Sequence, residues 1–167
     1  MIKPFKDITP KIDPSVYVAD DAIIIGDVEI GEDASIWFGS VIRGDVSYIR
    51  IGARTNIQDM TMIHVSSNFG PTIIGEEVTV GHRVTLHGCT VERQCLVGMG
   101  AIIMDEARIG QQSMIGAGAL VSPGTVIPPR VLAIGSPARV KRDLTPAEIA
   151  YLDTSCRNYV ELKDLYR

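Results

Sequence analysis

Residues 91–127, VERQCLVGMGAIIMDEARIGQQSMIGAGALVSPGTVI, place an aliphatic residue at every sixth position. The series runs without a break through Val91, Val97, Ile103, Ile109, Ile115, Val121 and Ile127. An ordinary β-sandwich has strands of varied length and no fixed six-residue register. A fixed short period is instead typical of a solenoid, in which each repeat packs against its neighbours.

The same period extends through the preceding part of the chain. We call the aliphatic residue that opens each six-residue repeat, or hexad, its lead residue. The earlier leads are Val18, Ile24, Ile30, Ile36, Ile42, Ile51, Ile57, Ile63, Ile74, Val80 and Leu86. A small or β-branched residue follows nearly every lead by four positions, as Ala101 and Ala107 do, and marks a second inward position. Three hexads make one triangular coil, so residues three hexads apart stack at one strand spacing, about 4.7–4.9 Å.

The hexad period ends after Pro137, and the chain closes with a predicted helix. Thr145 is the expected N-cap, Pro146 takes the first helical position, and Glu148 completes a capping box. The sequence therefore predicts a single domain, 1–167, built as an all-β solenoid over 12–140 with a C-terminal α-helix over 145–165.

Composition and charge narrow the partners and the compartment. The net charge is −4 and no cluster of Lys and Arg is present, so neither a nucleic acid nor a membrane is an expected partner. The N-terminal residues lack the apolar core of a signal peptide, and no apolar run approaches about 18 residues. The three cysteines form no CxxC pair, which argues against a disulfide framework. We therefore expect a cytoplasmic protein with a small-molecule substrate.

The histidines have defined addresses within the hexads. His64 and His87 each follow a lead residue, and their leads lie one full coil apart, so the two imidazoles should stack. Both would then reach one metal ion at about 2.0–2.1 Å. His82 lies on the neighbouring face, where only another subunit can bring it to the same ion. Such a heterologous contact must close by rotation, and a homotrimer closes it.

Four charged or polar residues share these columns. Arg43 stacks one coil from His64, and Asp59 stacks one coil from His82, so Arg43 and Asp59 would meet across the subunit contact. Gln58 adjoins Asp59 and can direct its amide at a metal-bound water. Asp45 can hold Arg43 or a histidine from behind.

Three neutral imidazoles bound to one metal ion leave a fourth coordination position open for water, an arrangement that indicates metal-hydroxide chemistry. Zinc (Zn2+) in such a site lowers the pKa of bound water to about 7 and produces hydroxide at neutral pH. Hydroxide there would attack carbon dioxide or a small carbonyl compound. Fe2+ and Co2+ suit the same ligands.

The stretches VIRGDV (41–46), RTNIQDMTMIHV (54–65) and VGHRVTLHGC (80–89) occur in this order within the hexad pattern. Together they resemble the γ-class carbonic anhydrase family and its bacterial homologues in the hexapeptide-repeat transferase superfamily. The resemblance covers nearly the whole chain. It implies a left-handed parallel β-helix, a homotrimer, and the reversible hydration of CO2 to bicarbonate.

The resemblance also implies roles for single residues. The metal ligands correspond to His64 and His87 of one subunit and His82 of another, which agrees with the addresses above. Gln58 corresponds to the residue that orients the metal-bound hydroxide, and Arg43, Asp45 and Asp59 correspond to residues that hold the interface. Asn56 and Tyr159 match positions that line the pocket.

Two departures from the family pattern affect proton transfer. Val46 stands where the family has a proton-shuttling glutamate, and the loop after His64, VSSNFGPT (65–72), has no carboxylate. Two alternatives therefore stay open: an enzyme that processes acyl-coenzyme A thioesters, and a non-catalytic metal-binding trimer. An acyl-CoA enzyme needs a groove between subunits and a histidine as base, yet no histidine is left over if all three bind metal.

Overall fold

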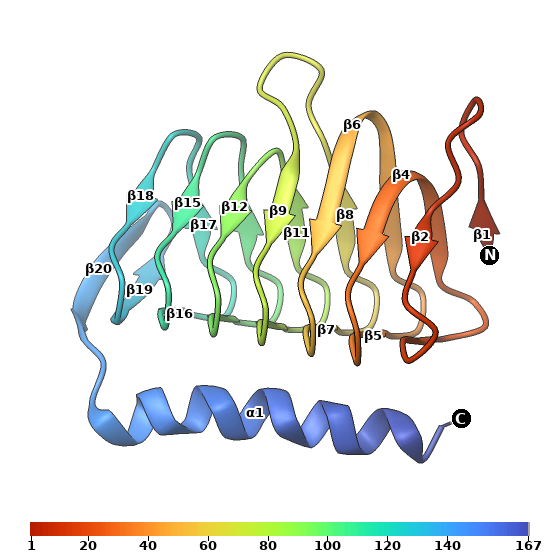
Figure 1. The fold of residues 1–167 in the computed structure, drawn as a ribbon. Helices are drawn as coiled ribbons and strands as arrows, with labels where there is room; N and C mark the ends of the chain where they lie inside the picture. Colours follow the sequence, from red (N-terminus) through yellow and green to blue (C-terminus); the bar gives the residue numbers. More distant parts are fainter. Residues whose placement is uncertain (167) are drawn as a thin grey trace.

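The chain forms a three-sided parallel β-helix with one α-helix, α1 (Pro146–Asp164), lying along one side (Figure 1). The structure is a computed structural model and describes residues 1–166. The first face contains β1 (Ile2–Lys3), β4 (Ile23–Ile30), β6 (Val41–Ile51), β8 (Met62–His64), β11 (Thr85–His87), β14 (Ile102–Ile103) and β17 (Leu120–Val121). Strands β4 and β6 continue into the second face.

The second face adds five short strands to these two long ones: β2 (Lys11–Ile12), β9 (Thr72–Ile74), β12 (Thr90–Val91), β15 (Arg108–Ile109) and β18 (Val126–Ile127). The third face is a separate sheet of β3 (Tyr17–Val18), β5 (Ser35–Ile36), β7 (Asn56–Ile57), β10 (Thr79–Val80), β13 (Leu96–Val97), β16 (Met114–Ile115), β19 (Val131–Gly135) and β20 (Ala138–Asp143). Helix α1 contacts β5, β7 and β10 of this third face.

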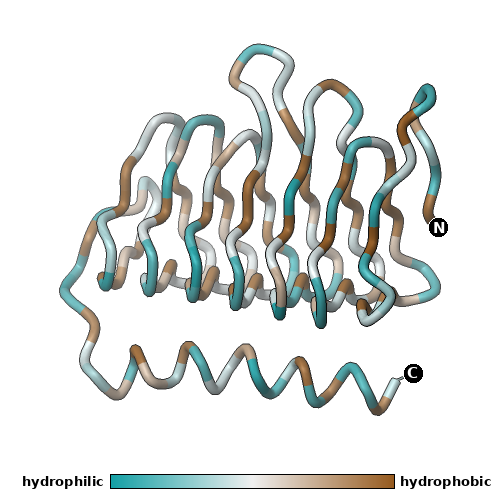
Figure 2. Tube along the Cα trace, viewed as in Figure 1, coloured by the Kyte–Doolittle hydropathy of each residue, from teal (hydrophilic) through white to brown (hydrophobic). Residues whose placement is uncertain are grey.

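The predicted hexad register is confirmed. Leu86 pairs with Ile63 on one side and with Ile103 on the other, in parallel ladders. These three leads are fully buried, and Figure 2 shows apolar segments recurring at matching places in successive coils. The second inward position is buried in most hexads, as at Ala101 and Ala107, but Val46 after Ile42 is exposed and Thr125 after Val121 is half-buried. After Leu86, Cys89 is buried and Thr90 is half-buried, because this hexad is one residue short.

A glycine follows several of the lead residues. A tight corner would suggest that glycine is needed there for a positive φ, but the structure shows a different cause. At Gly52 an added Cβ would lie 2.5 Å from the backbone nitrogen of Glu76 and 2.6 Å from the carbonyl oxygen of Gly75. The positive φ of the same corner falls on Arg54, at 56°. Glycine is therefore required by the close approach of the next coil rather than by its own backbone conformation.

The ends of the β-helix differ from the predicted range 12–140. Strand β1 precedes residue 12 and pairs with β4. After β19 the chain turns at residues 136–137, and β20 pairs antiparallel with β19, beyond residue 140. The cause is the loss of the period after Pro137, because another parallel coil needs further hexads. The edge strand β20 carries Arg139, Lys141 and Arg142, charges that discourage edge-to-edge pairing.

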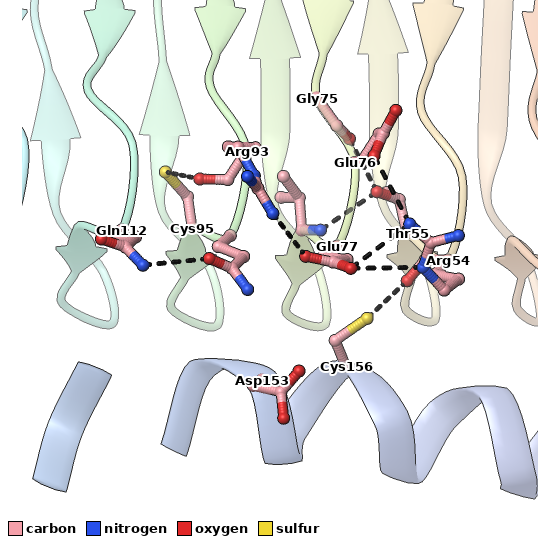
Figure 3. A network of polar contacts seen from close by, with 12 residues as sticks. Arg54, Thr55, Gly75, Glu76, Glu77, Arg93, Cys95, Gln112, Asp153 and Cys156 are labelled. Carbon is pink, nitrogen blue, oxygen red and sulfur yellow. Dashed lines mark hydrogen bonds and ion pairs between the residues drawn. The ribbon is translucent and has the colours of Figure 1, made fainter. Parts of the chain in front are cut away.

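The predicted helix is confirmed with its cap. Thr145 and Glu148 form the reciprocal capping box, and α1 ends at its C-cap, Leu165. The thiol of Cys156 donates to the carbonyl oxygen of Arg54 at 2.7 Å, within the ladder of ion pairs drawn in Figure 3. Farther along, the buried Nζ of Lys163 lies 3.0 Å from Asp33 Oδ1. Both contacts tie the helix to corners of the third face.

No helix in the described part of the chain, residues 1–166, is long and apolar enough to cross a membrane.

The cap of α1 gives a pH-dependent prediction. Hydrogen bonds from Arg142 lower the pKa of Glu148 from its usual 4.5 to about 2. The ionised carboxylate therefore stabilises the fold fully above about pH 5 and loses this effect as the pH falls toward about 2. The difference in unfolding free energy between the native protein and Glu148→Gln should be constant at higher pH and shrink below about pH 5. Urea titrations at several pH values measure it, with Glu161→Gln as the matched helix control. A difference that does not change with pH contradicts the prediction.

Candidate metal centre

His64 and His87 stack as predicted. They pair in the ladder between β8 and β11, and Nδ1 of His64 lies 3.2 Å from Nε2 of His87. Two imidazole nitrogens bound tetrahedrally to one zinc ion are about 3.3–3.4 Å apart, because each Zn–N distance is about 2.0–2.1 Å. The pair therefore fits two neighbouring ligands of one metal ion.

A carboxylate holds the other nitrogen of each imidazole. Nε2 of His64 lies 3.0 Å from Asp45 Oδ1, and Nδ1 of His87 lies 2.8 Å from Asp105 Oδ1. The second oxygen of Asp45 accepts a hydrogen bond from Arg43, so Asp45 holds both predicted partners. Such carboxylate–imidazole contacts fix the tautomer and aim the free nitrogen at the metal.

The pKa of Asp45 reflects these contacts. Burial raises the pKa of this carboxyl group, but hydrogen bonds from His64 and Arg43 outweigh burial and hold the pKa below its usual value. Asp45 is therefore ionised at neutral pH and can keep a proton on Nε2 of His64.

Asp105 is a site residue that the sequence interpretation missed. It follows the lead Ile103 by two positions, one coil beyond Gly88. A Cβ at Gly88 would lie 2.4 Å from Asp105 Oδ1, so the glycine after His87 makes room for this carboxylate. The available signal was a glycine next to a candidate ligand, with an acidic residue one coil away.

His82 lies on a different side of the chain. It follows β10 at the corner between the third and first faces, and its side chain is 43% exposed. Nδ1 of His82 lies 2.7 Å from Asp59 Oδ2, as the predicted stacking of these residues requires. Within residues 1–166, no three His, Cys, Asp or Glu side chains converge on a point that could hold a metal ion.

The candidate residues therefore form two groups on one chain. Half-site 1 comprises Arg43, Asp45, His64, His87 and Asp105. Half-site 2 comprises Asn56, Gln58, Asp59, His82 and Tyr159. The ion pair between Arg43 and Asp59 is predicted across the subunit contact and stays a prediction. Within the chain, Arg43 donates to Asp45 and Asp59 contacts His82.

Half-site 2 lies partly under α1. Gln58 and Asn56 are buried, and Gln58 Nε2 donates to Asn56 Oδ1 at 3.0 Å. Tyr159 lies on α1 with its ring edge-on to Trp37, 5.5 Å between centroids. Burial raises the pKa of Tyr159, and the negative charge of Asp59 adds to this effect. Its phenol is thus neutral at pH 7.

Large apolar side chains are exposed around His82. Met60 follows Asp59 and is 60% exposed, and Met99, one coil beyond His82, is 61% exposed. Met62 and Ile102, on the adjacent first face, and Phe38 are each about 40% exposed. Exposed apolar groups of this kind are typical of protein contacts.

Comparisons with known proteins identify the family. Residues 9–44 match the family model "Bacterial transferase hexapeptide (six repeats)", and residues 71–104 match "Hexapeptide repeat of succinyl-transferase". A carbonic anhydrase of Geobacillus kaustophilus is 52% identical over 167 residues, which cover 100% of this chain and 91% of the relative. The chain belongs to the γ-carbonic-anhydrase-like family of hexapeptide-repeat proteins.

Other members of this γ-carbonic-anhydrase-like family carry different names. Gamma carbonic anhydrase 2 of Arabidopsis thaliana, a mitochondrial protein, is 46% identical over 96% of this chain, which spans only 59% of that relative. A crystal structure from Bacillus cereus, described as a candidate acetyltransferase, has a TM-score of 0.96 and 48% identity. It covers 99% of this chain and 96% of its own. The shared fold therefore does not by itself decide between the two activities.

Asp105 gives a prediction about metal affinity. Asp105→Asn removes the charge behind His87 and should weaken zinc binding by about 10- to 100-fold. Asp27→Asn is the matched control, because Asp27 pairs with Arg50 at 2.7 Å and holds no histidine. Competition with a chromophoric chelator measures both affinities. Equal affinity in the two variants would show that Asp105 does not support the metal.

Proposed function

We propose that the protein is a γ-type carbonic anhydrase that hydrates CO2 reversibly at a metal centre shared between the subunits of a homotrimer. The observation that carries this proposal is the His64–His87 pair, with a carboxylate behind each ring and 3.2 Å between the two facing nitrogens. The 52% identity to a named carbonic anhydrase supports the substrate.

The third ligand would come from His82 of the partner subunit. Asp59 holds Nδ1 of His82, so Nε2 is the nitrogen left for a metal. The exposed apolar side chains of Met60 and Met99 beside it favour burial against another subunit. In that contact half-site 1 of one chain would face half-site 2 of the next, and Arg43 would approach Asp59 of the partner subunit.

Zinc bound by three imidazoles supplies a Lewis acid that lowers the pKa of bound water to about 7, and Fe2+ or Co2+ suits the same ligands. The chain's own residues would orient the reactants. Gln58 would orient the water or hydroxide at the centre, and Asn56 holds the Gln58 amide by the hydrogen bond to its nitrogen. Tyr159 packs edge-on against Trp37 on this side and would line the pocket.

The cytoplasm is the compartment we propose. Cys89, Cys95 and Cys156 are free and buried. Burial raises the pKa of Cys89 and Cys95 to about 12, so neither is a reactive thiolate. Unpaired thiols fit a reducing environment.

Two other functions remain as candidates. The similarity to a candidate acetyltransferase favours an acyl-CoA reaction, which needs a histidine as base. Each of the three histidines has a carboxylate partner, and no histidine is left over as a base if all three bind metal. A non-catalytic metal-binding trimer is favoured by the missing shuttle groups. Acetylation assays with acetyl-CoA and hydration assays with CO2 separate the three.

Subunit mixing tests the shared centre directly. His64→Ala and His82→Ala should each abolish CO2 hydration in the zinc-loaded and anaerobically iron-loaded proteins. Trimers that contain both variants regain intact centres wherever a His82→Ala chain supplies half-site 1 and a His64→Ala chain supplies half-site 2. Random mixing makes this about one contact in four, so stopped-flow activity should return to about a quarter of native.

Mixing His64→Ala with His87→Ala is the matched control. Both substitutions lie in half-site 1, so no contact in these trimers can be intact, and activity should stay absent. Activity that returns in neither mixture would contradict a shared centre. Full metal occupancy without hydration by the native protein would contradict the carbonic anhydrase proposal itself.

Val46 gives a prediction about proton transfer. Its side chain is 54% exposed beside Asp45, and hydration releases a proton that no carboxylate in the 65–72 loop can accept. Val46→Glu should raise turnover in dilute buffer by about tenfold or more and matter little in concentrated buffer. Val46→Gln controls for size and polarity. An equal rise in both variants would exclude a proton-shuttle explanation.

A further inference from the structure

A chain of four buried polar side chains connects α1 to Gln58. Gln58 Nε2 donates to Asn56 Oδ1 at 3.0 Å, and Asn56 Nδ2 donates to Thr79 Oγ1, also at 3.0 Å. The hydroxyl oxygens of Thr79 and Ser155 are 3.1 Å apart. Asn56 lies in β7, Gln58 directly follows this strand, Thr79 lies in β10 and Ser155 lies in α1.

The two amide hydrogen bonds of this chain have one direction, from Gln58 to Asn56 and from Asn56 to Thr79. Thr79 Oγ1 accepts from Asn56 with one lone pair, and either Thr79 or Ser155 can donate the hydrogen bond between the two hydroxyl groups. Both amides therefore donate toward the helix. Hydrogen bonds aligned in this way polarise and strengthen one another.

The hydrogen bond from Gln58 to Asn56 determines which atom of the Gln58 amide remains available to a group at the metal site. Its nitrogen is held by Asn56, whereas among residues 1–166 no group donates a hydrogen bond to its Oε1. By register Gln58 lies between Trp37 on one coil and Gly81 on the next. Gly81 has no side chain to cover the amide and immediately precedes His82.

Packing does not explain why Thr79 and Ser155 carry hydroxyl groups in a buried position. Ser155 is buried in the same face of α1 as Leu152 and Cys156. Burying a hydroxyl group costs free energy unless it is hydrogen-bonded, and valine would fill the space of Thr79 equally well. The pair is explained by the partner it provides for Asn56.

We propose that Thr79 and Ser155 are positioning residues that orient the Gln58 amide with its oxygen toward the metal site. The inference rests on the proposed function. An amide oxygen accepts a hydrogen bond, so Gln58 Oε1 would receive the O–H of the water or hydroxide at the site. The lone pairs of that water or hydroxide would then point toward carbon dioxide.

Thr79→Val and Thr79→Ser form the central comparison. Valine keeps the shape but removes the acceptor for Asn56, whose amide is then free to turn and donate to Gln58 Oε1. We expect kcat for CO2 hydration to fall by about 10- to 100-fold, with KM nearly unchanged. Serine keeps the hydroxyl group and should restore native kcat.

Nuclear magnetic resonance of the metal-free protein gives a readout independent of activity. In 15N-labelled protein with EDTA, the side-chain amide of Gln58, assigned with Gln58→Glu, should shift and exchange faster in Thr79→Val but not in Thr79→Ser. Ser155→Ala should act in the same direction, and alanine is favourable in a helix. Ser113→Ala is the matched control, because this buried hydroxyl donates to Pro128 in another coil.

An unchanged Gln58 signal in Thr79→Val overturns the inference, and so does a changed signal with native kcat. If no metal form of the native protein hydrates CO2, the proposed function fails. The amide signals then still decide whether Thr79 and Ser155 orient Gln58.

Discussion

The structure depends on the stacking of one coil on the next at the spacing of parallel strands. Hydrogen bonds between successive coils require the leads to lie in columns, as Ile63, Leu86 and Ile103 do. The same bonds bring backbones so close at the corners that a Cβ at Gly52 would touch the next coil. The ladder therefore sets, for every side chain next to a lead, its position along the solenoid axis and the direction in which it leaves the backbone.

The histidine pair follows from this constraint. His64 and His87 come next to stacked leads, so the ladder alone brings their rings together. Two imidazoles in such proximity need groups that decide which nitrogen carries the proton. Asp45 and Asp105 do this, one from the preceding coil and one from the following coil. The coil thus places the rings, and the carboxylates determine their tautomers.

The sequence predicted the features that depend on the period and missed those that depend on side-chain direction. The hexad register, the helix cap at Thr145 and the stacking of His82 on Asp59 were all predictable from positions along the chain. Asp105 was not, because its carboxylate reaches His87 diagonally across Gly88. The antiparallel return of β20 was also missed, because a lost period does not specify what replaces it.

The loop between β8 and β9 leaves the coil without altering the strands on either side of it. His64 ends β8, and β9 resumes the ladder in register with β6 and β12, so residues 65–71 leave the coil and return without changing it. A longer or shorter loop would leave the spacing of His64 and His87 unchanged, since that spacing comes from the β8–β11 ladder. Evolution can therefore vary the surroundings of the two histidines, including their acidity and accessibility, while the spacing of the two rings is inherited intact.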